Sequence, residues 1–196
     1  MTLADKFTTS RLVMAPAFFV IYLLPRFFPA LGSALWTLPI LWIIYIVSEV
    51  TDLIDGKVAR KRGEVSDFGK LYDPFADTLV QITFFFCFVI DGILPAFLLL
   101  IVIYREFGIL FIRNLMLKRG ITLAARMGGK IKTVSYIVAV GFALLAASII
   151  RLNLPGEFYR WSVIAAIVIF SLSVIISVAS FIDYFIIFLK NSDKNY

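Results

Sequence analysis

The 196-residue sequence contains no histidine and a single cysteine, Cys87. Without histidine the chain cannot form a His-ligated metal or haem site, a Ser–His catalytic triad or a phosphohistidine. A single cysteine excludes an internal disulfide, and because Cys87 lies within an apolar run we expect it to serve packing rather than redox chemistry. Any catalysis must therefore depend on other polar side chains.

Charged residues are also scarce. They make up 16% of the chain while hydrophobic residues make up 61%, whereas a soluble domain has about 25% charged and about 45–50% apolar residues. So few charges cannot cover a water-exposed surface. A soluble enzyme, a disordered chain and a nucleic-acid-binding domain are therefore poor interpretations despite the net charge of +6. We expect an integral membrane protein with no nucleic-acid partner.

Six long apolar stretches predict an all-α integral membrane fold with six transmembrane helices, because one span needs about 20 residues. Turn residues such as Pro29, Asp91-Gly92 and Pro155-Gly156 separate the stretches. We expect one membrane-embedded domain over residues 1–196, with a short N-terminal segment at 1–9, a tail at 190–196 and no cleavable signal peptide. The expected helices lie near 10–29, 34–62, 66–90, 94–118, 128–150 and 158–189.

Lysine and arginine are distributed unevenly between the two ends of these helices. With six spans, both termini lie on one side of the membrane together with the second and fourth loops. Of the 19 Lys and Arg residues, only Arg26, Arg151 and Arg160 fall on the opposite side. Because basic residues favour the cytoplasmic side, we expect both termini and the basic loops to lie at the cytoplasmic surface.

Four aspartates flank the second predicted loop. Asp52 and Asp55 end the second helix, and Asp73 and Asp77 begin the third. Positions three or four apart share one face of a helix, so each pair forms a stripe. A short linker makes the two helices antiparallel neighbours, and the stripes then face each other. The sequence therefore predicts four carboxylates converging at the cytoplasmic membrane surface.

Converging carboxylates repel one another, and burying them is costly unless cations neutralise them. Oxygen ligands without His or Cys suit Mg²⁺ or Mn²⁺, and two such ions about 3.5–4 Å apart would clamp a phosphoryl group. Gly56, Ala59 and Gly69 leave room for a ligand, and Arg60 suits a phosphate oxygen. The alternative is a solvated hairpin in which the acids pair with the nearby lysines and arginines. The single-face spacing favours a metal–diphosphate site.

The complete pattern, Asp-x2-Asp-Gly-x2-Ala-Arg-x8-Gly-x3-Asp-x3-Asp from Asp52 to Asp77, resembles the signature of the CDP-alcohol phosphotransferases. These are integral membrane enzymes with six transmembrane helices, in which an alcohol displaces CMP from a CDP-linked substrate. The resemblance implies that Asp52, Asp55, Asp73 and Asp77 bind two Mg²⁺ or Mn²⁺ ions, and that Asp77 also accepts the alcohol's proton. It implies further that CDP-diacylglycerol contacts Gly56, Ala59, Arg60, Ser66, Gly69 and Thr8.

Four further segments resemble one bacterial branch of this family, which makes phosphatidylglycerophosphate from CDP-diacylglycerol and glycerol 3-phosphate. The branch implies a homodimer in the plasma membrane. Thr78 stands where the branch usually has lysine, and Glu49 is an additional acid inside a span. The segments are Thr8-x2-Arg11, Ser66-Asp67-Phe68-Gly69 running into Asp73-Pro74, Arg105-Glu106 followed by Arg113, and Gly120 to Thr133 with Gly129-Lys130-Ile131-Lys132.

Basic residues near the cytoplasmic ends of the fourth and fifth helices suit a phosphorylated acceptor, because glycerol 3-phosphate is a dianion. Several of them have the alternative role of contacting anionic lipid head groups. The acceptor alternatives are inositol phosphate, serine and choline. A cation channel or transporter lined by aspartates is a remote alternative, which the clustering of the acids at one surface disfavours. The residues expected to hold the acceptor's phosphate are Arg105, Arg113, Arg126, Lys130 and Lys132.

Overall fold

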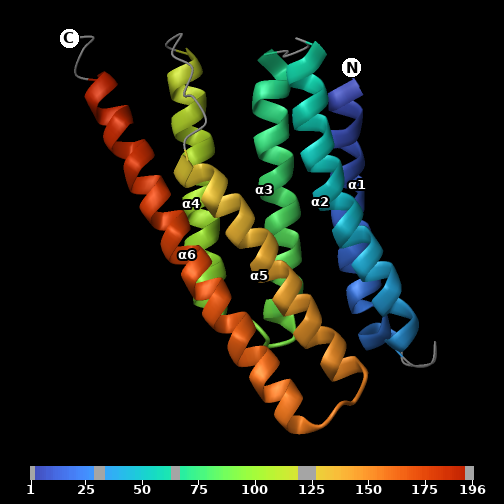
Figure 1. The fold of residues 1–196 in the computed structure, drawn as a ribbon. Coiled ribbons are helices and arrows are strands. Elements are labelled where there is room, and N and C mark those ends of the chain that lie inside the picture. Colours follow the sequence, from blue (N-terminus) through green and yellow to red (C-terminus); the bar gives the residue numbers. More distant parts are fainter. Residues whose placement is uncertain (1–2, 29–33, 63–66, 119–126, 193–196) are drawn as a thin grey trace.

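The structure is a computed structural model that describes residues 3–28, 34–62, 67–118 and 127–192. All regular structure in these ranges is helical, which confirms the predicted all-α fold. The helices run side by side, and both termini lie at the same end of the bundle (Figure 1). The elements are α1 Leu3–Phe27, the short 3₁₀ helix η2 Ala34–Trp36, α2 Thr37–Arg62, α3 Asp67–Ile90, α4 Ala96–Lys118, α5 Met127–Arg151 and α6 Gly156–Ser192.

The expected helix limits agree with the structure to within a few residues except at the start of α1. This helix begins at Leu3, whereas the sequence suggested a start near residue 10 with a separate segment before it. The physical reason lies in the polar residues of the first turns. The Thr8 hydroxyl donates to Asp73 and Arg11 pairs with the aspartates of α2 and α3, so helical geometry here places polar groups on one inward face.

Within the described ranges, four helices are long and apolar enough to cross a membrane on length and composition alone: Lys6–Phe27, Tyr72–Ile90, Met127–Arg151 and Gly156–Lys190. The other two long helices, α2 and α4, lie alongside them in the bundle (Figure 1), and their crossing stays a prediction. The two helices carry charges that an isolated span would not tolerate. In α4, Arg105 and Glu106 are 6% and 5% exposed, so they are turned toward protein rather than lipid.

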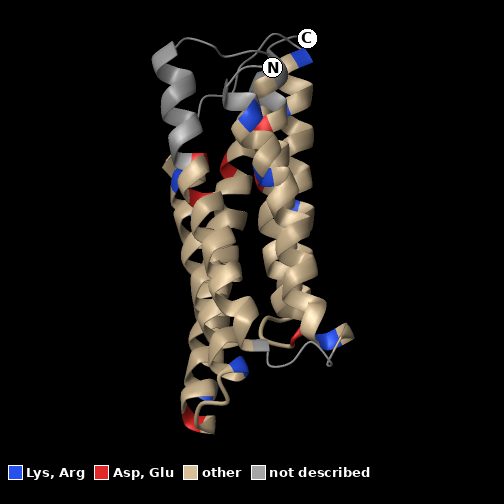
Figure 2. Ribbon diagram, turned by 90° about the vertical axis from the view of Figure 1, so that its right-hand side faces the viewer, with Lys and Arg blue, Asp and Glu red and all other residues tan. Residues whose placement is uncertain are grey.

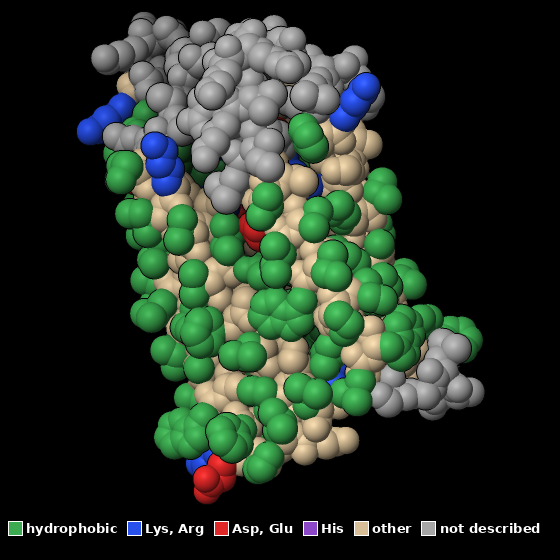
Figure 3. All heavy atoms as spheres, turned by 45° about the vertical axis from the view of Figure 1, so that its right-hand side comes forward, with side chains coloured by type: hydrophobic (Ala, Val, Ile, Leu, Met, Phe, Trp, Pro, Cys, Tyr) green, Lys and Arg blue, Asp and Glu red, His purple; other side chains and the backbone are tan. Residues whose placement is uncertain are grey.

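Charged residues gather toward the two ends of the helices and leave most of the middle uncharged (Figure 2). Hydrophobic side chains cover the middle of the face shown in Figure 3. Such an apolar belt between charged ends is what a lipid bilayer requires of a spanning protein.

Aromatic side chains on α3 contact neighbouring helices on two sides. The Phe84 ring lies 4.6 Å from that of Phe18 on α1, and the Phe85 ring lies 4.5 Å from that of Phe170 on α6. Phe84 and Phe85 are fully buried, whereas Phe86 is exposed. Helix α3 therefore packs against α1 on one side and against α4 and α5 on the other, and its Phe85 reaches α6.

Small residues let the remaining helices approach closely, as is common in membrane bundles. On α4, a Cβ added to Gly108 would lie 2.9 Å from the ring of Phe181 on α6. Helix α5 buries a row of alanines against its neighbours: Ala139, Ala143, Ala146 and Ala147.

The end of the bundle opposite the termini is closed by a polar clamp. The Tyr22 hydroxyl donates to Asp91 at 2.7 Å. Arg151 donates to Thr37 Oγ1 at 2.6 Å and to the Tyr22 carbonyl at 2.8 Å. The clamp joins the far ends of α1 and α5, the start of α2 and the turn after α3, so polar groups at this end are occupied with one another.

We expect Ala143→Leu to destabilise the protein by about 1–3 kcal/mol, because the enlarged side chain must force apart helices that are already in contact. Val138→Leu is the matched control, since Val138 lies on the same helix but is exposed to the surroundings. Thermal unfolding in one detergent measures both. Equal melting temperatures for the two variants would contradict close packing at Ala143.

Candidate active site

Three aspartates from two helices converge at the end of the bundle that carries both termini. Asp52 lies on α2, and Asp73 and Asp77 lie one turn apart on α3. One carboxylate oxygen from each lies within 4.8 Å of the other two. The side chains are partly exposed, so the cluster is open to water and to solutes. Asp55 belongs to α2, but its side chain lies outside the described residues.

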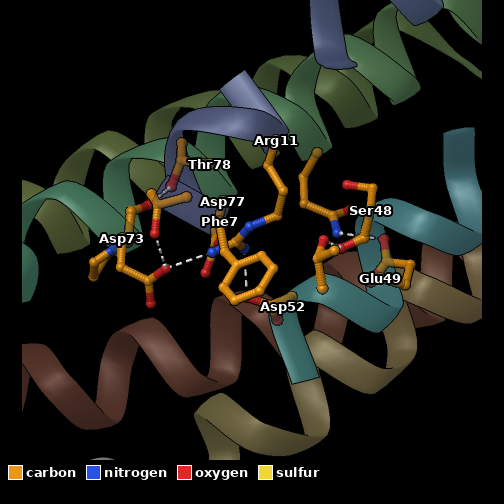
Figure 4. Close-up of polar contacts among 12 residues, drawn as sticks. Phe7, Arg11, Ser48, Glu49, Asp52, Asp73, Asp77 and Thr78 are labelled. Atoms are coloured by element: carbon orange, nitrogen blue, oxygen red, sulfur yellow. Dashed lines mark hydrogen bonds and ion pairs between the residues drawn. The ribbon is translucent and has the colours of Figure 1, made fainter. Parts of the chain in front are cut away.

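Arg11 of α1 lies between these carboxylates (Figure 4). Its Nη1 pairs with Asp52 and Asp77, and its Nη2 donates to Asp73 Oδ1 at 2.5 Å. The side chain is almost fully buried. One turn earlier, Thr8 Oγ1 donates to the same Asp73 oxygen at 3.3 Å. Helix α1 therefore supplies the counter-charge for both aspartate stripes.

Arg11 is a site residue that the sequence analysis did not identify as one. The available signal was its spacing of three from Thr8, which places the two side chains on one face of a helix. The sequence alone did not indicate which helices that face would meet. Asp52 of the first predicted stripe does face Asp73 and Asp77 of the second, but a guanidinium from a third helix lies between them.

Two residues noted as unusual lie beside the cluster. Glu49, one turn before Asp52, accepts a hydrogen bond from Gln81 Nε2 at 3.4 Å. Thr78 is buried, and its hydroxyl donates to the carbonyl of Pro74 at 2.9 Å. Thr78 is thus engaged with its own helix backbone.

A cavity of about 280 Å³ extends from the aspartates to a basic wall on α4 and α5. The wall contains four of the five residues expected to hold an acceptor phosphate, while Arg126 lies outside the described residues. The acidic side of the cavity is lined by Arg11, Asp52, Asp73 and Asp77, and the basic side by Arg105, Arg113, Lys130 and Lys132 together with Glu106.

The residues expected to hold the cytidine diphosphate are described only in part. Thr8 donates to Asp73, and Gly69 lies on α3 one turn before Asp73. Ser66 lies outside the described residues. The side chains of Ala59 and Arg60, and the surroundings of Gly56, lie outside them too, so their roles stay predictions.

The basic residues differ in how the protein holds them. Arg105 donates to Glu106 Oε1 at 2.8 Å, to the Ser177 carbonyl at 3.1 Å and to Ser180 Oγ at 3.4 Å, so internal partners occupy much of its guanidinium. Arg113 lies over the ring of Tyr184 at 5.7 Å. Among the described residues its buried Nε has no hydrogen-bond partner, so Arg113 has a donor left for an anion in the cavity.

The aspartate cluster fits a hard divalent cation. Its donors are all carboxylate oxygens, the ligands that Mg²⁺ and Mn²⁺ prefer, and they converge within the span of one ion's coordination shell. That the same oxygens attract Arg11 shows that the cluster requires positive charge. A cation bound here would compete with the guanidinium for these oxygens.

We expect Arg11→Gln to destabilise the protein in the presence of a chelator by about 2 kcal/mol, less than the cost of breaking a fully buried ion pair because the carboxylates are partly exposed. Mg²⁺ should then raise the melting temperature of the variant more than that of the wild type, since no guanidinium competes. Lys6→Gln, an exposed position on α1, is the control. Identical responses of Arg11→Gln and wild type to Mg²⁺ would contradict the competition.

Comparison with known proteins agrees with this geometry. Residues 1–176 match the CDP-alcohol phosphatidyltransferase family. A Treponema pallidum (strain Nichols) protein named CDP-diacylglycerol–glycerol-3-phosphate 3-phosphatidyltransferase is 37% identical over 191 residues, covering 94% of this chain and 88% of that protein. A Bacillus subtilis (strain 168) protein of the same name is 35% identical over 159 residues, 79% of each chain. A Mycobacterium tuberculosis (strain H37Rv) protein named probable phosphatidylglycerophosphate synthase is 30% identical over 182 residues, covering 93% of this chain and 79% of that protein. With its aspartate cluster and this match over most of its length, the chain belongs to the CDP-alcohol phosphatidyltransferase family.

Proposed function

We propose that this protein transfers the phosphatidyl group of CDP-diacylglycerol to glycerol 3-phosphate and releases CMP. The family supports the reaction class, and the names of the relatives support both substrates. The observation that carries the proposal is that a carboxylate cluster and a basic wall face each other across one cavity. One side suits a metal-bound diphosphate, and the other suits the phosphate of a second substrate.

On the acidic side, Asp52, Asp55, Asp73 and Asp77 would hold two divalent ions, Mg²⁺ or Mn²⁺. Bound there, the ions would neutralise the charge of the diphosphate and of the departing CMP. The cytidine diphosphate itself would contact the residues of the resemblance: Gly56, Ala59, Arg60, Ser66, Gly69 and Thr8.

Asp77 is the proposed general base. Its carboxylate lies at the cavity and is partly exposed, so an acceptor hydroxyl can reach it. The hydroxyl oxygen attacks the phosphorus of the phosphatidyl group while its proton passes to Asp77. A new phosphodiester bond forms, the bond between that phosphorus and the CMP oxygen breaks, and CMP leaves with the electron pair.

On the basic side, four residues that line the cavity would bind the acceptor's phosphate, namely Arg105, Arg113, Lys130 and Lys132, together with Arg126. A zwitterionic alcohol such as serine, or a cationic one such as choline, would leave this wall without a matching dianion. Inositol phosphate carries the same group, and only an assay separates it from glycerol 3-phosphate.

The proposal includes one membrane domain over residues 1–196 that works as a homodimer in the plasma membrane. The basic bias of one side supports a cytoplasmic location for both termini and the cavity. Water-soluble glycerol 3-phosphate would then enter from the cytoplasm, while the acyl chains of the donor stay in the bilayer.

The direct test is CMP release by the detergent-purified full-length chain supplied with CDP-diacylglycerol. We expect release to require both Mg²⁺ or Mn²⁺ and glycerol 3-phosphate. Parallel reactions contain inositol phosphate, serine, choline or no acceptor. Release with one of those acceptors alone would overturn the acceptor assignment, and no release with any acceptor would overturn the proposed reaction.

We expect Asp77→Asn to lower CMP release by at least about 10²–10⁴-fold, the usual contribution of a general base, because the amide cannot accept the hydroxyl proton. Asp183→Asn removes an exposed carboxylate from α6 and should keep wild-type turnover. Rates at saturating substrates are compared for the two variants. Wild-type turnover by Asp77→Asn would exclude this residue as the base.

A further inference from the structure

Glu106 is a buried carboxylate on the wall of the cavity, for which the proposed reaction has no role. It is 5% exposed and lies on α4 among the cationic residues. Its Oε1 accepts hydrogen bonds from Arg105 Nη1 at 2.8 Å and from Lys132 Nζ at 3.1 Å. One carboxylate oxygen thus holds two cations that come from two different helices.

The two cations depend on Glu106 to different degrees. Arg105 also donates to the Ser177 carbonyl and to Ser180 on α6, so α6 would retain it without Glu106. Lys132 has its ammonium against Glu106 and 4.7 Å from the centre of the Tyr136 ring. The ring attracts a cation only weakly compared with a carboxylate at hydrogen-bond distance.

A lysine ammonium in so apolar a setting is stable only when an anion accompanies it. Lys132 is 16% exposed at its side chain, and the carboxylate at 3.1 Å is the anion that holds it at the cavity wall. An ammonium that lost this partner would shed its proton or turn toward water. Either change would remove a positive charge from the surface that faces the aspartates.

We infer that Glu106 is a positioning residue that holds Lys132, and through it the basic wall, in the arrangement that receives the acceptor's phosphate. This inference rests on the proposed function and deepens it. Together the three side chains carry one net positive charge, so the wall attracts an anion while each buried charge keeps a partner. Glu106 acts through Lys132 and does not itself contact the substrates.

The test uses Glu106→Gln in the full-length, detergent-purified chain. The amide keeps the size of the side chain but removes its charge. We expect the KM for glycerol 3-phosphate, and its Kd measured by calorimetry, to rise about 10-fold or more, as the loss of a charged hydrogen-bond partner implies. The kcat and the KM for CDP-diacylglycerol should change by less than about 3-fold.

Two further variants separate positioning from general stability. Asp91→Asn removes a carboxylate that accepts from Tyr22 at the other end of the bundle, and it should leave both KM values unchanged. In a Lys132→Met background, Glu106→Gln should add less than about 2-fold to the acceptor KM, since both changes remove the same interaction. Glu106→Asp, which keeps the charge on a shorter side chain, should give an intermediate KM and replaces Glu106→Gln in the comparison if the latter is not monodisperse.

Several outcomes would overturn the inference. An unchanged or lowered KM for glycerol 3-phosphate in Glu106→Gln, with only a lower melting temperature, would make the residue purely structural. Full additivity with Lys132→Met would show that it does not act through Lys132. These results occur with a wild type that uses glycerol 3-phosphate. A wild type that does not use it instead refutes the proposed function, and the inference with it.

Discussion

The repulsion among three carboxylates within 4.8 Å of one another is the constraint on which the arrangement of this bundle depends. Two unit charges 4 Å apart repel by about 4 kcal/mol at an effective dielectric constant of 20. The first helices of the chain are organised around this cost. Helix α1 extends back to Leu3, so that Thr8 lies on the same helix as Arg11 and donates to Asp73. Arg11 pairs with Asp52, Asp73 and Asp77 together, and the partial exposure of the aspartates keeps them hydrated. A guanidinium neutralises only part of their charge, so the cluster still attracts cations.

Pairing of buried charges also shapes the other half of the molecule, helices α4 to α6. Charges that would be costly in α4 are tolerated because Glu106 pairs with both Arg105 and Lys132 inside the protein. At the opposite end, Tyr22, Asp91 and Arg151 are occupied in a closed clamp. The polar cavity lies toward the end of the bundle that carries both termini. Under the proposed function, a water-soluble and a membrane-bound substrate would meet there.

The sequence predicted the elements well and the contacts between them poorly. Apolar runs predict six helices, because length and hydropathy act locally. The spacing of Asp52, Asp73 and Asp77 is enough to predict that α2 and α3 are neighbours. The sequence alone does not identify Arg11 as part of the cluster. It shows which residues share a helical face with Arg11, but not which helices that face contacts. Glu106 is next to Arg105 in an apolar run. Its inferred role depends on Lys132, which is 26 residues later in the sequence and lies on a different helix. Such pairings are set by the packing of α4, α5 and α6, which no local pattern encodes.

The aspartates and the basic wall lie on different helices, which explains why the donor chemistry is easier to infer from the sequence than the acceptor. The aspartates and their counter-charge belong to α1, α2 and α3, where residues must keep fixed spacings to share one ion cluster. The basic wall belongs to α4 and α5 and is supported by α6 through Ser177 and Ser180. Each half has its own internal contacts, and α3 joins the two by packing against α4 and α5 and by the ring contact of its Phe85 with Phe170 of α6. Under the proposed function, changes in the wall would therefore alter which alcohol is accepted without disturbing the carboxylates. The signature of Asp52 to Asp77 would then constrain the reaction, while the partner of Lys132 would constrain the substrate.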